Sequence, residues 1–156
     1  LISYWAVMCF IPTPGLEKVT FEEGKNLANW FDGEYLPGLK WSGKYDPEGF
    51  LSTFPAIATC LLGVLVGIVF KDENKNPSEK LKLVFSFGVL LIIAGSIWHL
   101  QFPVIKKLWT SSYVLVAGGC SMVLLGVFYY LIDILIFPKV CNLANLPNPF
   151  HIKNSL

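Results

Sequence analysis

Arginine is absent from this chain, and histidine is scarce. All twelve basic residues are lysines, and the histidines are His99 and His151. Without a guanidinium group the chain cannot clamp a carboxylate or phosphate through two parallel hydrogen bonds, although biased genomic composition is the simpler explanation of the missing arginines. The four cysteines show no Cys-x-x-Cys or Cys/His spacing, so we expect no metal site. Because Cys9, Cys60 and Cys120 lie in apolar stretches, we expect them to be small buried apolar side chains.

Charge is also scarce, and the uncharged runs are long. Of the 156 residues 54% are hydrophobic and 15% are charged, and the mean hydropathy is +0.56, which is too apolar for an ordinary soluble domain. Residues 50–70 carry no charge and, at about 1.5 Å per residue, are long enough to cross the ~30 Å hydrocarbon core of a bilayer. We predict further spans at about 83–100 and 113–137 and a partial span at about 1–11. The predicted fold is an all-α polytopic transmembrane helical bundle, and because the chain starts within an apolar stretch we expect a fragment of a larger bundle.

The distribution of lysines predicts how the bundle is oriented. Residues 71–82 carry four lysines in a short connection, which the positive-inside rule places in the cytoplasm. Residues 13–48 carry four lysines against seven acidic residues, so we expect this loop to be external. The same alternation predicts an external loop at 101–110 and a cytoplasmic segment from 138.

Two carboxylates, Asp46 and Glu48, precede the first full span. One interpretation is a helix start, in which Asp46 is the N-cap, Pro47 takes the first helical position and Glu48 complements the positive helix end. The other is a pair of carboxylates at a water-accessible helix end, able to bind an amine or shuttle a proton. The sequence leaves both interpretations open.

A lysine pair stands on the side that the positive-inside rule disfavours. Lys106 and Lys107 lie in the predicted external loop 101–110, which suggests a task such as holding an anion. We predict that they converge with Asp46 and Glu48 on one cavity, within about 6 Å, the range over which opposite charges stabilise each other. Trp109, beside them, is expected to anchor the chain at the membrane interface.

The external loop 13–48 contains a short predicted helix. Thr20 and Glu23 fit a capping box, in which each side chain bonds the other residue's backbone. We expect its apolar side to lie on the membrane surface and to consist of Phe21, Leu27, Trp30 and Phe31.

Glycines within the spans predict close helix packing. Gly63 and Gly67 form a Gly-x-x-x-Gly motif, and Gly118, Gly119 and Gly126 lie in the last span. Asp133, in the same span, either reaches the cytoplasmic interface or serves as a proton relay.

Four blocks of residues carry a family resemblance: 4–6 with 12–15, 26–28 with 30–32, 46–49 with 53–59 and 62–63, and 102–114. Through these blocks the chain resembles the heparan-α-glucosaminide N-acetyltransferase family of polytopic membrane acyltransferases. The resemblance implies transfer of an acetyl group from acetyl-coenzyme A to the amine of a terminal glucosamine. The family's catalytic histidine has a following Trp-x-Gly pattern that neither His99 nor His151 shows, so we expect it outside this chain and the chain alone to be inactive.

The resemblance also gives the candidate site residues their expected roles. Asp46 and Glu48 would be catalytic, orienting the acceptor amine or tuning the missing histidine. Lys106, Lys107 and Trp109 would bind substrate, the lysines through charge and the indole against a sugar ring or the acyl chain.

Two other functions remain open. The chain could belong to a transporter or flippase of amino sugars or lipid-linked sugars, or to a purely structural membrane subunit. Inverted hydropathy repeats in the full gene would favour transport. The expected partners are membrane lipid, a sugar acceptor and, as one option, a second copy in a homodimer, with no nucleic acid. The expected location is the inner membrane of a bacterium, where the acceptor would be an envelope amino sugar.

Overall fold

Helices account for the regular structure of this chain. The computed structural model describes residues 1–40, 43–46, 49–136 and 139, and within these ranges it contains no strand, which confirms the all-α prediction. The elements are α1 (Ile2–Phe10), α2 (Leu27–Tyr35), α3 (Phe50–Lys71), α4 (Pro77–Trp98), the 3₁₀ turn η1 (Lys106–Leu108), α5 (Ser111–Tyr129) and the π-helical turn η2 (Tyr130–Ile136).

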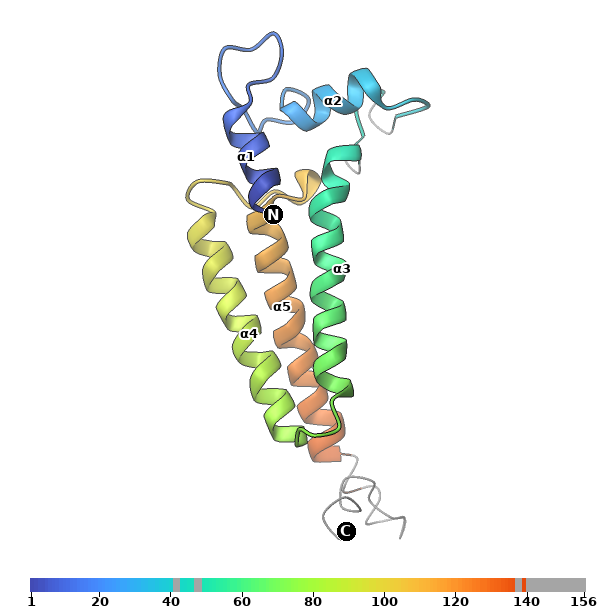
Figure 1. Ribbon diagram of the computed structural model, residues 1–156, viewed down its shortest axis with the longest axis vertical. Coiled ribbons are helices and arrows are strands. Elements are labelled where there is room, and N and C mark those ends of the chain that lie inside the picture. The colour runs from blue at the N-terminus through green and yellow to red at the C-terminus, as the bar shows by residue number, and fades with distance from the viewer. Residues whose placement is uncertain (41–42, 47–48, 137–138, 140–156) are drawn as a thin grey trace.

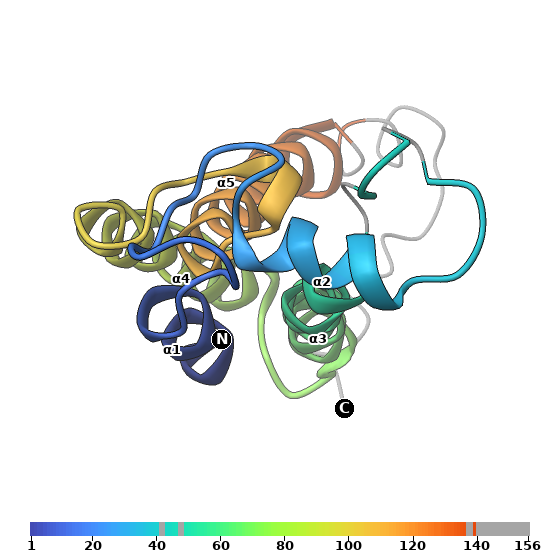
Figure 2. The ribbon, with the colours of Figure 1, turned by 90° about the horizontal axis from the view of Figure 1, so that it is seen from above.

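The three long helices run side by side, and the two short ones lie at one end of them (Figure 1). α3, α4 and α5 with η2 are each long and apolar enough to cross a membrane. Figure 2, seen from above, shows α2 lying across the end of α3. Only 6% of the most apolar part of α3 is buried within this chain, so lipid or other protein must cover the rest.

The helix bounds follow local sequence signals. α3 begins at residue 50, where the uncharged run begins. α4 begins at Pro77, six residues before the predicted span, because Asn76 and Glu79 form a capping box and proline suits the first helical position. Residues 1–11, predicted as a partial span, form α1, which lies beyond the ends of α4 and α5 rather than beside them (Figure 1).

A glycine seam brings α4 and α5 together. A Cβ atom added to Gly119 would lie 2.5 Å from the carbonyl oxygen of Gly88, and one added to Gly88 would lie 2.9 Å from that of Gly119. Gly118 faces the other neighbour, since its Cβ would meet Leu62 of α3 at 2.9 Å. Gly63 and Gly67 have open space where a Cβ would be, so the structure does not use their motif for packing within the described residues.

Two cysteines in the spans lie on the outer surface. Cys60 and Cys120 are exposed and Cys9 is partly buried, so the prediction that all three are buried is wrong. The physical reason is that apolar residues of a membrane helix need not face protein, since lipid is as apolar as a protein core.

The glycine seam predicts a difference between two matched substitutions. Gly119→Val should destabilise the protein by about 1–3 kcal/mol, the usual cost of overpacking, because the new side chain meets the α4 backbone. Gly63→Val, into open space, should leave the thermal unfolding temperature in detergent nearly unchanged. Equal losses in the two variants would contradict the seam.

The separation of the loops predicts how cysteine labels react. Lys18 lies in the loop that follows α1, and Lys75 lies in the connection between α3 and α4 at the opposite end (Figure 1). In a cysteine-free background of the full-length protein, an impermeant maleimide added to intact cells should label Lys18→Cys and should label Lys75→Cys only after the membrane is opened. Labelling of both from one side would refute the predicted orientation.

Candidate functional site

The N-terminus of α3 is capped by a side chain from another helix. The first N–H groups of a helix have no partner within it, and Gly49, the N-cap residue of α3, has no side chain to supply one. Instead Oδ1 of Asp32, on α2, accepts the backbone N–H of Phe50 at 2.9 Å. A Cβ on Gly49 would lie 1.7 Å from Oδ2 of Asp32, so only glycine leaves room for the carboxylate. The interpretation of Asp46 as the N-cap is therefore wrong.

Asp32 is an acid in an environment that disfavours its charge. Its side chain is 2% exposed, and burial is the main cause that raises its pKa above the ordinary 3.8. The Phe50 N–H acts in the opposite direction, the charge of Asp46 raises the pKa further, and the charge of Lys40 lowers it. The structure thus places a buried carboxyl group within electrostatic range of the predicted catalytic Asp46.

A network of amides fixes α2, which carries Asp32. Asn26 is the N-cap of α2: its Oδ1 accepts the N–H of Asn29 at 2.9 Å, and its Nδ2 donates to Oδ1 of Asn29 at 2.6 Å. Both asparagines are buried. The predicted capping box is wrong, because Thr20 accepts the N–H of Glu22 in a turn and the helix begins only at Leu27. Fully bonded buried networks of this kind rigidify their surroundings.

An ion pair joins this loop to η1. Nζ of Lys107 lies 2.7 Å from both carboxylate oxygens of Glu23, and the hydroxyl of Tyr45 donates to the same carboxylate. Lys107 is the main cause that lowers the pKa of Glu23, and Glu23 in turn raises the pKa of Lys107. Because Tyr45 precedes Asp46, the lysine and the predicted acid lie on connected segments at the same end of the bundle.

Trp109 ties η1 to α3. Its backbone has a φ of 50°, in the left-handed region, and its indole N–H donates to Oγ1 of Thr59 at 3.1 Å. The ring also meets Tyr113 edge-on, with centroids 5.5 Å apart. The indole N–H and part of the ring surface are therefore already engaged in contacts within the chain.

Three fully buried hydroxyl residues follow Trp109 and close this end of the bundle. Oγ1 of Thr110 accepts the N–H groups of Ile105 and Tyr113. Ser111 donates to the carbonyl of residue 1 at 2.8 Å, and Ser112 donates to that of residue 102 at 2.6 Å. These bonds satisfy backbone groups that the membrane could not.

The predicted site residues have different outcomes. Lys107 is paired with Glu23, and the exposed Lys106 makes no ion pair within the part of the chain that the structure describes. Glu48 lies outside the described residues, as does His151, so the approach of Glu48 to Lys107 stays a prediction. His99 accepts the N–H of Val104 through Nδ1 at 3.0 Å and so closes the turn after α4.

Two acids at this end, Asp32 and Glu23, were not predicted from the sequence as residues of the site. Asp32 stands in one of the blocks that carry the family resemblance, which is the signal that could have singled it out. Glu23 was assigned to a capping box, and no local pattern points to a lysine 84 residues away.

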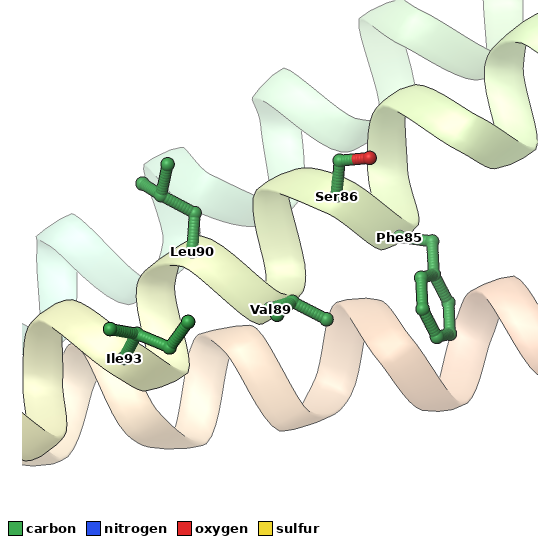
Figure 3. A pocket seen from close by; sticks show the side chains of 5 residues that line it. All are labelled: Phe85, Ser86, Val89, Leu90 and Ile93. Carbon is green, nitrogen blue, oxygen red and sulfur yellow. The ribbon is translucent and has the colours of Figure 1, made fainter.

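The hollows described on the membrane-spanning surface are lined by no acidic side chain. One of about 480 Å³ lies on α4 and is lined by Phe85, Ser86, Val89, Leu90 and Ile93, which include no titratable group (Figure 3). Among the described residues, no three His, Cys, Asp or Glu side chains lie together as metal ligands would. The polar end formed by α2, the start of α3 and η1 is therefore the candidate site.

Three apolar membrane-length helices with a polar cap at one end define an integral membrane protein of the helical type. Comparison with known proteins confirms the family resemblance at a distance. The chain is similar to heparan-alpha-glucosaminide N-acetyltransferase of Mus musculus, at 28% identity over 96 residues. The match covers 58% of this chain and 15% of the mouse protein. No family model matches the chain, and no solved structure does.

The buried carboxyl group predicts a pH dependence of stability. Because the pKa of Asp32 is raised in the folded chain, its protonation favours folding. Its contribution is fully present below the ordinary pKa of 3.8 and is lost as the pH rises through the raised value. Asp32→Asn keeps an oxygen that can accept the Phe50 N–H but does not titrate. Relative to that variant, the wild type should lose stability as the pH rises from about 4.

Thermal unfolding of both proteins across this pH range measures the effect. Asp32→Ala is the matched control for the cap and should lower stability by about 1 kcal/mol. A difference between wild type and Asp32→Asn that does not change with pH would contradict a raised pKa at this position.

Proposed function

We propose that the full-length protein is a membrane-bound acyltransferase that moves an acetyl group from acetyl-coenzyme A to the amine of a glucosamine-type sugar. The observation that carries this proposal is the similarity over 96 residues to a protein named for N-acetyltransfer to heparan α-glucosaminide. Since the chain spans 15% of that protein's length, the activity is proposed for the whole molecule and not for this segment.

The reaction needs a base and an oriented amine. The neutral amine attacks the carbonyl carbon of the thioester, a C–N bond forms, the C–S bond breaks, and coenzyme A leaves as the thiolate, which then takes a proton from the protonated base. The proton that the nitrogen loses goes to a base, for which the resemblance implies a histidine outside this chain. Asp46 and Glu48 would hold the amine or stabilise the protonated histidine. Asp32 is less suited to direct contact, because its carboxylate is buried and bonded to Phe50.

The cations at this end fit a binding role. Lys106 is exposed and could contact an anionic group, whereas Lys107 would first have to leave Glu23. The indole ring of Trp109 would pack against a sugar ring or the acyl chain while its N–H stays on Thr59. We place the protein in a bacterial inner membrane, with an envelope amino sugar as the acceptor and a homodimer as one assembly.

The proposal is tested on the full-length protein in proteoliposomes. Radiolabelled acetyl-coenzyme A and glucosamine should give labelled N-acetylglucosamine in proportion to the amount of protein. Labelled glucosamine that crosses the membrane unchanged, with no acetylated product, would favour the transporter instead.

The role of Asp46 is tested by a conservative substitution. Asp46→Asn should lower turnover by roughly 10²–10⁴-fold if this carboxylate takes part in acid–base chemistry. The structure rules out loss of an N-cap as the cause, since Asp32 caps α3. Glu34→Gln, which neutralises an exposed acid on α2, should keep full turnover per folded molecule. Full turnover in Asp46→Asn as well would remove the carboxylate from the mechanism.

A further inference from the structure

We propose that α2 lies in the membrane interface, with Phe31 and Tyr35 inserted beside the first turn of α3 at the boundary between lipid headgroups and acyl chains. The partner is the bilayer itself. The inference does not depend on acetyl transfer and holds for a transporter as well.

The depth at which α3 lies in the bilayer determines the depth of α2, which lies across its end. The last residue of α3, Lys71, marks one membrane boundary because its charge stays out of hydrocarbon. From there the 21 preceding residues of α3 rise about 32 Å, close to the ~30 Å thickness of the hydrocarbon core. Phe50, the first residue of α3, therefore lies at the opposite boundary.

An unbroken row of aromatic rings leads from this boundary to α2. The ring of Phe50 lies 5.6 Å from that of Phe54 on α3 and 5.9 Å from that of Phe31 on α2, in a stacked arrangement. The ring of Phe31 lies 4.9 Å from that of Tyr35. Each contact is within the range of favourable ring pairs. The row carries the apolar surface of α3 onto α2 without a break.

The sequence of α2 directs these rings toward the membrane. Ala28, Phe31, Asp32 and Tyr35 have the i, i+3, i+4, i+7 spacing of one helix face. Two residues of this face are buried, since Ala28 is 3% and Asp32 is 2% exposed. The later part continues past α3, where α2 extends beyond it (Figures 1 and 2), and Tyr35 is 62% exposed.

A groove beside the row has the character of an acyl-chain site. It measures about 300 Å³ and is lined by Phe31, Tyr35, Leu36, Pro37 and Phe50. In water this surface would be an exposed apolar patch with no compensation. Tryptophan and tyrosine are enriched at membrane–water interfaces, where one end of the ring is apolar and the other is wet. The continuity with the exposed face of a spanning helix selects lipid as the occupant.

Spin labels at neighbouring positions test the placement. In a cysteine-free background of the full-length protein reconstituted in liposomes, one nitroxide is attached at Tyr35→Cys. A second label is attached at Glu34→Cys, the adjacent exposed residue outside the face, as the matched control. A third at Phe54→Cys, 57% exposed on α3, is the reference for a lipid-facing position.

The readout is the ratio of collisions with oxygen, which concentrates in lipid, to collisions with a water-soluble nickel chelate. We expect a severalfold higher ratio at 35 than at 34, between the values at 34 and 54. Equal ratios at 34 and 35 would place the face in water. A label at 35 that both reagents fail to reach would mean that another protein segment covers it. Either result overturns the proposal.

Discussion

The arrangement of the polar end depends on one requirement, that the first N–H of α3 find an acceptor where the helix meets the membrane. Gly49 leaves the space for it, and Asp32 supplies the oxygen. The carboxylate can do so only if α2 stays across the end of α3, which is what the buried amides of Asn26 and Asn29 secure. The cap thus couples the shape of the loop to the start of a membrane span.

The need to hydrogen-bond buried backbone groups also explains why polar side chains are buried at the N-terminal end of α5. Thr110, Ser111 and Ser112 are fully buried, yet their hydroxyls meet backbone groups from η1, α1 and the turn after α4. Hydroxyls can donate and accept at once, so small side chains join several segments without an ionised group. The ion pair of Glu23 and Lys107, in contrast, lies at the exposed surface.

What could be predicted from the sequence is what local patterns determine. The start of α3 follows from an uncharged run, whereas the early start of α4 was missed although Asn76, Pro77 and Glu79 form a readable signal. The partners at the site could not be found this way. Asp32 bonds a residue 18 positions away, and Lys107 bonds Glu23 across 84 positions. Which of several exposed acids Lys107 meets depends on the course of the loops, and the periodicity of the sequence does not show that course.

The glycine seam has a mechanical consequence for the bundle. α4 and α5 touch backbone to backbone at Gly88 and Gly119, so they move as one stiff hairpin. α3 lacks such a seam: Gly118 receives Leu62, while Gly63 and Gly67 face open space. In a bilayer thinner than the hydrophobic length of the helices, tilting relieves the mismatch, and α3 is the helix that this packing leaves freest to tilt. Both ends of α3 are held as it tilts, one by the Asp32 cap at Phe50 and the other by the bond from Lys80 to the carbonyl of Phe70.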